Sequence, residues 1–326
     1  MSINFLGDVF LDNAYAIDVD LDDYIFNLEF PLSTSGIPAK NKINLGVEQS
    51  HIFETFKKFP LAVNLANNHI MDYGEKSFSE TLAFLQKHDI AFFGAGNTQN
   101  NFNNPCIIKK DKKKIALLGY SCPSTHSVFG SDQVNGSALL DDEKAIEDIQ
   151  ACRASSDMVI LNLHWGDEEI RYPKPSDVTR ARKFIDAGAD LIIGHHAHVI
   201  QSTEVYKGKH IFYGLGNFIF PDFDVPAYYD GEKFQKKASK KQNRANKEAL
   251  IVDLSDVAAL TYRTTFFDGK TVCLQKTKIP SWIPKTEKSY RRYYKLWQRK
   301  RMIELYLQNP RVPNLKQIKL FLGINR

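Results

Sequence analysis

The chain has 326 residues, of which 43% are hydrophobic and 25% are charged. This length and composition exclude a disordered or fibrous chain and indicate a globular protein with one large domain or two smaller ones. No apolar run approaches the roughly 20 residues that a membrane-spanning helix needs. Met1 leads into a strand-like segment without the features of a secretory signal, and the four cysteines form no Cys-x-x-Cys pair. We therefore expect reduced thiols and a cytoplasmic protein.

Strand-like and helical segments alternate through the first two thirds of the chain. Strands are predicted at residues 3–8, 24–29, 61–66, 90–93, 114–120, 158–163, 191–193 and 210–213. Helices are predicted at residues 51–59, 77–88, 142–151 and 176–188, the last with Ser176 as its N-cap. This alternation predicts an α/β protein, in which ligands collect at the carboxyl ends of the strands.

The last third of the chain has a different character. Residues 231–247 are rich in lysine and poor in large apolar side chains, which predicts a mobile basic loop. Two or three strands are expected between residues 249 and 279, followed by a linker at 280–284. We therefore expect one domain over residues 1–280 and a separate tail over residues 285–326.

The net charge of +5 conceals two parts of opposite charge. The tail holds twelve Lys and Arg residues and two Asp and Glu residues, a net charge of +10, so the remainder carries −5. The pattern of the tail is that of a basic amphipathic helix, which most often packs against its own domain. Contact with a membrane surface or an acidic partner is the alternative.

A histidine-rich stretch follows the predicted strand at residues 191–193. Gly194 is followed by His195, His196, Ala197 and His198. Along an extended chain His196 and His198 project from the same side and His195 from the other. Two imidazoles on one side can hold a metal ion, whereas the simpler interpretation is a polar strand end that faces water.

Four other predicted strands also end in side chains that can bind metal, namely Asp8, Glu29, Asn68 with His69, and His164. Each has a local explanation, such as a turn, a cap or a hydrogen-bonded core histidine. Their common placement at strand ends favours a metal centre instead. Carboxylate, carboxamide and imidazole ligands suit Mn, Fe or Zn, and we expect one or two divalent ions.

A pair of ions that shares a carboxylate could clamp the reacting oxygens in a displacement at phosphorus. His69 is then the candidate to protonate the leaving oxygen. The alternative for His69 is to orient a neighbouring ligand without moving a proton.

Several motifs resemble, in chain order, those of the CapA family of capsule and poly-γ-glutamate synthesis proteins. They are Phe26-Asn27-Leu28-Glu29, Asn64-Leu65-Ala66-Asn67-Asn68-His69, Gly94-Ala95-Gly96-Asn97, His164-Trp165-Gly166, Gly194-His195-His196-Ala197-His198 and Tyr213-Gly214-Leu215-Gly216-Asn217. The resemblance covers about residues 3–254. It implies the four-layer α/β/β/α sandwich of the calcineurin-like metallophosphoesterases, here with a C-terminal helical extension.

The resemblance also implies roles for individual residues. The metal ligands would be Asp8, Glu29, Asn68, His164, His196 and His198, with His69 as the presumed acid and His195 outside the ligand set. Two positions depart from the superfamily pattern. Phe10 replaces the histidine of the first motif, which removes one ligand, and Glu29 replaces a bridging aspartate.

The implied function is a metal-dependent hydrolase of a phosphoester or related bond in the synthesis of a capsule, poly-γ-glutamate or another envelope polymer. The alternative is a non-catalytic assembly factor with the same fold, and cleavage of nucleic acid ranks last. The partners expected are the polymer or its phosphorylated precursor, and a membrane surface or a capsule-synthesis protein at the tail. Glu168, Arg171, Asn217 and Tyr120 are weaker candidates for the pocket lining, with loop or capping roles as the alternative.

Overall fold

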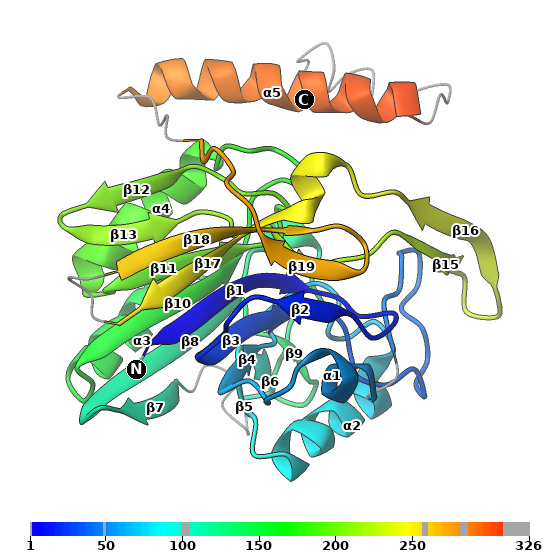
Figure 1. Ribbon diagram of the computed structural model, residues 1–326, viewed down its shortest axis with the longest axis horizontal. Helices are drawn as coiled ribbons and strands as arrows, with labels where there is room; N and C mark the ends of the chain where they lie inside the picture. Colours follow the sequence, from blue (N-terminus) through cyan, green and yellow to red (C-terminus); the bar gives the residue numbers. More distant parts are fainter. Residues whose placement is uncertain (1, 48–49, 99–104, 256–259, 281–285, 309–326) are drawn as a thin grey trace.

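Two β-sheets pack face to face in the computed structural model, with helices against their outer faces (Figure 1). The structure describes residues 2–47, 50–98, 105–255, 260–280 and 286–308. Within these residues, no helix is both long and apolar enough to cross a membrane.

The first sheet combines N-terminal and C-terminal strands. Its spatial order is β2 (Ala16–Asp18), β19 (Thr271–Leu274), β18 (Leu260–Phe267), β17 (Glu248–Leu254), β1 (Ile3–Val9), β3 (Asp23–Leu28), β4 (Ala62–Asn64) and β5 (Ala91–Phe93). Strand β14 (Asn217–Ile219) also pairs with β1, in parallel. Strands β1, β3, β4 and β5 are parallel neighbours, so their carboxyl ends lie at one edge of the sheet.

The second sheet has the order β12 (Thr203–Tyr206), β13 (Lys209–Phe212), β11 (Leu191–His195), β10 (Met158–His164), β8 (Lys113–Ser121) and β7 (Cys106–Lys110). Its four central strands are parallel. Two small antiparallel pairs are separate from the sheets, β6 (Ala95–Gly96) with β9 (Gly136–Ser137) and β15 (Phe223–Tyr229) with β16 (Phe234–Lys240).

Three apolar layers hold the elements together. One lies between the sheets and contains Phe5, Leu117 and Ile193. The second packs α1 (Ser50–Thr55) and α2 (Gly74–Lys87) on the first sheet, and the third packs α3 (Asp142–Arg153) and α4 (Pro175–Ala187) on the second. The expected four-layer α/β/β/α sandwich is confirmed.

A fifth helix, α5 (Glu287–Gln308), lies across one side of this sandwich (Figure 1). Its Tyr290 and Tyr294 are buried in the layer that also holds α4. The predicted helix in the tail is therefore present and packs on the body, whereas residues 309–326 of the predicted tail lie outside the described residues.

Two predictions from sequence differ from the structure. Residues 231–247, expected as a loop, contain β16 and a short 3-10 helix at Arg244–Lys247, because β16 pairs with β15 and needs few apolar residues at this exposed place. Lys174, not Ser176, is the N-cap of α4, because Pro175 occupies the first helical position and moves Ser176 into the first turn.

Candidate metal centre

The predicted ligand residues from the two sheets meet at one buried place. Asp8 lies in β1, and Glu29 directly follows β3, the parallel neighbour of β1. His164 ends β10 and pairs in register with His195, which ends β11. The carboxyl ends of these four strands therefore converge between the sheets, as α/β sheets place their sites.

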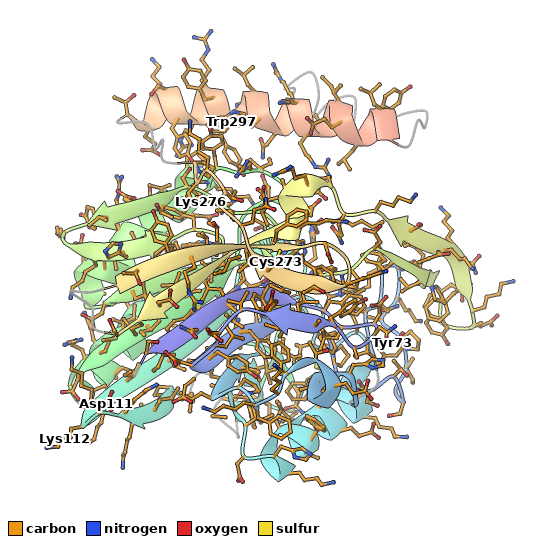
Figure 2. All side chains as sticks on the ribbon, in the orientation of Figure 1. Tyr73, Asp111, Lys112, Cys273, Lys276 and Trp297 are labelled. Carbon is orange, nitrogen blue, oxygen red and sulfur yellow. The ribbon has the colours of Figure 1, made fainter. Side chains whose placement is uncertain are left out.

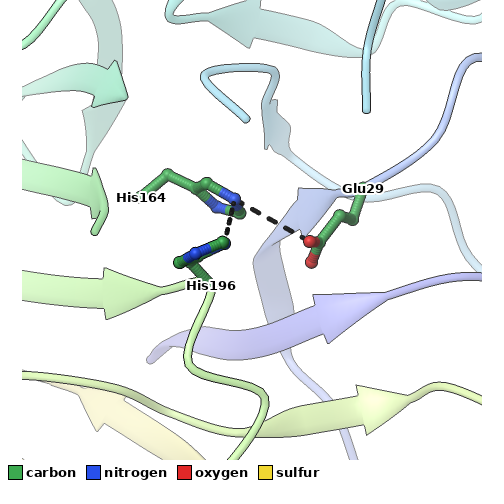
Figure 3. Close-up of side chains that lie close together, drawn as sticks. All are labelled: Glu29, His164 and His196. Atoms are coloured by element: carbon green, nitrogen blue, oxygen red, sulfur yellow. Dashed lines mark hydrogen bonds and ion pairs between the residues drawn. The ribbon is translucent and has the colours of Figure 1, made fainter. Parts of the chain in front are cut away.

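One group of donor atoms surrounds His164 Nε2. It lies 2.9 Å from Asn68 Oδ1, 3.1 Å from His196 Nδ1 and 3.8 Å from Glu29 Oε1. Figure 3 shows the imidazoles of His164 and His196 facing the Glu29 carboxylate. Two ligand atoms that each bind the same ion at about 2.1 Å lie about 3.0–3.5 Å from each other in octahedral or tetrahedral coordination. We call Glu29, Asn68, His164 and His196 the first donor group.

A second donor group consists of Asp8, Glu29 and His198, whose candidate ligand atoms all lie within 4.8 Å of one another. His198 Nδ1 is 3.4 Å from Asp8 Oδ2, and His198 Nε2 is 3.5 Å from Glu29 Oε1. The Oδ1 atom of Asn217 lies 2.8 Å from His198 Nδ1. A hydrogen that Nδ1 donates to Asn217 leaves the Nε2 lone pair facing Glu29.

Glu29 is common to both groups and its Oε1 atom is buried without a hydrogen-bond partner. A buried carboxylate oxygen without a partner costs free energy unless a cation compensates it. Oxygen and imidazole donors in this arrangement fit a divalent transition metal better than they fit Ca²⁺. The residues present therefore fit the ion that the fold implies.

The pKa values of the two buried carboxylates are shifted in opposite directions. Burial raises the pKa of Glu29 well above its usual range, and the charge of Asp8 adds to this rise. Burial also tends to raise the pKa of Asp8, but His195 and His198 outweigh it and hold that pKa well below its usual range. Two carboxylates this close favour one charged and one protonated form until a cation is present.

The pKa values of the three buried imidazoles are also shifted in different directions. Burial lowers the pKa of His164 well below its usual range and lowers that of His196 to about 4, which keeps both rings neutral. Burial lowers the pKa of His198 as well, but Glu29 and Asp8 together raise it to about 9. Neutral imidazole is the form that binds metal, so His164 and His196 need no deprotonation.

The backbone bends sharply where the histidines converge. His196 and His198 both have positive φ angles, of 82° and 54°, a conformation that costs free energy in residues other than glycine. The chain thus leaves the extended form at His195, so the expected alternation of sides does not apply. His196 and His198 nevertheless both reach the centre, one in each donor group.

His195 has a supporting position. Its Nδ1 atom lies 3.1 Å from Asp8 Oδ1 and its side chain is buried. Asn27 Nδ2 donates to the same Asp8 oxygen at 2.8 Å, and Asn64 and Asn67 donate to Asn27 Oδ1, each at 3.2 Å. The sequence interpretation missed this asparagine network, although asparagines inside otherwise apolar strands were a visible signal.

His69 lies beside the centre with a carboxylate behind it. Its Nδ1 atom is 2.6 Å from Asp72 Oδ2, and its side chain is 13% exposed. Lys42 bridges Asp72 and the backbone oxygen of Asn68. This arrangement fixes the imidazole and allows its other nitrogen to donate or accept a proton.

The weaker candidates have different positions. Glu168 is half-exposed and lies 3.9 Å from Lys240 Nζ. Asn217 contacts His198 as described, whereas Arg171 lies against Glu248 and the backbone oxygen of Lys278. Tyr120 does not line the centre, because its hydroxyl donates to Asp148 on the α3 side of the sheet.

Phe10 is part of the core. Its ring centroid lies 5.6 Å from that of Phe30, 5.2 Å from that of Phe220 and 6.4 Å from that of Phe223. Phe220 in turn contacts the ring of His198, at 4.9 Å between centroids. An aromatic cluster therefore occupies the position at which the sequence resemblance implies a further ligand, and the second donor group has fewer protein donors than the first.

The chain is similar in sequence to known capsule biosynthesis proteins. The capsule biosynthesis protein CapA of Bacillus anthracis is 32% identical over 207 residues, which is 61% of this chain and 50% of the relative. The PGA biosynthesis protein CapA of Bacillus subtilis is 31% identical over 226 residues, which is 69% of this chain and 59% of the relative. The chain thus spans only half to three fifths of the length of these two relatives.

Solved structures also align with the chain. A 5'-nucleotidase precursor from Thermus thermophilus has a TM-score of 0.38 and 15% identity, covering 75% of this chain and 44% of that one. A hypothetical protein from the same organism has a TM-score of 0.44 and 12% identity, covering 85% of this chain and 100% of that one.

The family model described as bacterial capsule synthesis protein PGA_cap matches residues 4–222. This match spans more than half of the chain, which therefore belongs to the PGA_cap (CapA) family of bacterial capsule synthesis proteins.

Proposed function

We propose that the chain is a metal-dependent hydrolase that cleaves a phosphoester or related bond during synthesis of a capsule, poly-γ-glutamate or another envelope polymer. The observation that carries the proposal is the buried Glu29 carboxylate. Glu29 belongs to both donor groups, and its Oε1 atom has no hydrogen-bond partner. Divalent ions bound there would supply Lewis-acid activation of the scissile group and of water. Mn, Fe and Zn suit this donor set.

The side chains of the protein would have three kinds of role, namely to hold the ions, to transfer a proton and to contact the substrate. Asp8, Glu29, Asn68 and the three ligand histidines His164, His196 and His198 hold the ions, and Asn217 orients the His198 ring. His69 transfers a proton to the oxygen that leaves when water replaces it at phosphorus, and Asp72 holds the imidazole in position. Glu168, half-exposed beside Lys240, contacts the substrate outside the reacting bond.

His69→Asn, compared with His126→Asn, tests this assignment, because His126 is an exposed histidine that belongs to neither donor group and has a positive φ that asparagine tolerates. Both variants are reconstituted with Mn²⁺ or Zn²⁺ and assayed on bis(p-nitrophenyl) phosphate and a panel of phosphomonoesters. We expect His69→Asn to lower kcat by about 10²–10⁴ with unchanged metal content, and His126→Asn to have no effect. Equal activity of the two variants would remove His69 from the reaction.

A second function is favoured by Phe10, which fills a ligand position with a buried aromatic ring. The chain would then be an assembly factor for a surface polymer, with one structural ion and no turnover. Absence of hydrolysis across the panel, in wild-type protein with a full metal content, would support this function over the hydrolase.

A further inference from the structure

Helix α5 packs on the body through one stripe of side chains. Tyr290, Tyr294, Trp297 and Arg301 follow at intervals of four, three and four residues, which places them on one helix face. The Tyr294 hydroxyl donates to Asp167 at 2.8 Å, and Trp297 stacks on Tyr172 with 3.8 Å between ring centroids. Figure 2 shows Trp297 on the side of α5 that faces the body.

Arg301 completes this face through an ion pair with Glu169 at 2.5 Å. Residues 167–172 thus contact α5 along its length, and they belong to the loop that begins after His164. The inward face of α5 is therefore occupied, and the helix is held in a fixed orientation relative to the body.

The opposite face of α5 carries a stripe of cations. Lys288, Arg292, Lys295 and Arg299 have the same four, three and four spacing, shifted by two residues from the packed stripe. Two residues correspond to about 200° around a helix, so this stripe points away from the body. Among the described residues, no carboxylate lies within 4.0 Å of any of these four cations, whereas Arg291 and Lys300 pair with Glu287 and Glu304.

Large apolar side chains are exposed beside the cationic stripe. Leu296, Ile303 and Leu307 are 49%, 46% and 71% exposed, and their spacing of seven and four residues forms a second stripe. Tyr293, Leu305 and Tyr306 are also about half exposed. Exposed leucine and isoleucine side chains in a row are costly in water and indicate a surface that binds.

We propose that the outward face of α5 binds the surface of an anionic lipid membrane, with the helix lying flat on it. The four unpaired cations match anionic headgroups, and the adjacent apolar stripe reaches the boundary with the acyl chains. A purely electrostatic partner, such as a soluble acidic polymer, would leave the apolar stripe without a role. The inference is independent of the chemistry of the metal centre.

The loop that the inward face of α5 contacts also follows a candidate metal ligand. Asp167 and Glu169, which contact α5, lie on either side of Glu168 in the loop that follows the candidate ligand His164.

The test is co-sedimentation of the full chain with vesicles of phosphatidylcholine alone or of phosphatidylcholine with phosphatidylglycerol. We compare wild-type protein with Lys288→Gln/Arg292→Gln/Lys295→Gln/Arg299→Gln. The matched control is Lys233→Gln/Lys236→Gln/Lys237→Gln/Lys241→Gln, which removes four exposed charges from the β15–β16 hairpin and its flank. Circular dichroism and Tm establish that all variants fold. A third variant, Leu296→Gln/Leu307→Gln, reports on the apolar stripe.

We expect wild-type protein and the hairpin control to bind phosphatidylglycerol vesicles, and the α5 charge variant to bind at least about tenfold more weakly. The apolar variant should also bind more weakly, but with the salt dependence of wild-type protein, because its four cations remain. The proposal is overturned if wild-type protein does not prefer phosphatidylglycerol vesicles, or if both charge variants lose binding equally. Binding to soluble poly-glutamate but not to vesicles would also overturn it, in favour of an acidic polymer.

Discussion

His69 Nδ1 lies 2.6 Å from Asp72 Oδ2, and this contact leaves Nε2 as the ring nitrogen that is not bound to Asp72. Asp72 also accepts a hydrogen bond from the Leu45 backbone amide at 2.7 Å and pairs with Lys42, so it is held on several sides. A carboxylate in this position retains the hydrogen on Nδ1 and leaves Nε2 to act on a substrate.

Asp72→Asn is therefore expected to lower kcat on bis(p-nitrophenyl) phosphate by about 10–100-fold without changing metal content. The amide keeps the size of the side chain but can present a hydrogen donor to His69, which disfavours the required tautomer. Asp89→Asn, at an exposed position with positive φ that asparagine tolerates, is the control. An unchanged pH profile and kcat in Asp72→Asn would show that the contact is merely structural.

The contact of Tyr294 with the body indicates that α5 stabilises the folded protein. Its hydroxyl donates to Asp167, which is also paired with Lys174 at 2.6 Å. Tyr294→Phe should lower the free energy of unfolding by about 1–2 kcal/mol, because a buried hydrogen bond to a charged group is lost. It should also speed amide hydrogen exchange in residues 166–172. Tyr306→Phe, on the exposed side of α5, should change neither quantity, and equal effects in both variants would contradict this role.

Asp177 is a buried carboxyl in α4, outside both donor groups, and it should make the free energy of unfolding depend on pH. Burial raises its pKa to about 6, and its Oδ2 atom has no hydrogen-bond partner. The folded protein therefore holds the proton more tightly than the unfolded chain, whose aspartates titrate near pH 3.9. The protonated Asp177 carboxyl contributes fully to the free energy of unfolding below about pH 4. This contribution falls as the pH rises to about 6 and is absent at higher pH.

Asp177→Asn cannot ionise, so the variant should gain stability relative to wild-type protein as the pH rises from 4.5 to 7.5. The gain should be on the order of 2 kcal/mol by urea unfolding. Asp186→Asn, at the exposed end of the same helix, is the control and should not show this gain. A constant difference for Asp177→Asn would mean that the carboxyl titrates normally.

The sequence predicted most of the layers and the convergence of ligands because both depend on strong local signals. Apolar runs such as residues 158–163 and 191–193 cannot remain in water and form the central parallel strands. The carboxyl ends of parallel strands lie at one edge, so residues that directly follow them had to meet. Asp8, Glu29, His164, His196 and His198 accordingly lie together.

Features that depend on tertiary contacts could not be predicted in this way. The β15–β16 hairpin has exposed lysines on β16 and no strong apolar pattern there, because β15 and the loop at Lys40 and Ile43 supply its packing. The positive φ angles of His196 and His198 are imposed by the surrounding structure and leave no trace in residue type. His195 was left outside the predicted ligand set, and its contact with Asp8 was not foreseen.

The central claim is that Glu29 is shared by two groups of metal donors, and metal content tests it most directly. Wild-type protein, Glu29→Gln, His196→Ala and His126→Asn are loaded with Mn²⁺ or Zn²⁺, freed of excess ion and analysed by inductively coupled plasma mass spectrometry. Wild-type protein and His126→Asn should retain one or two ions per chain, His196→Ala should lose the ion of the first donor group, and Glu29→Gln should lose all bound metal. Retention of the wild-type metal content by Glu29→Gln, or failure of wild-type protein to retain any ion, would contradict the claim.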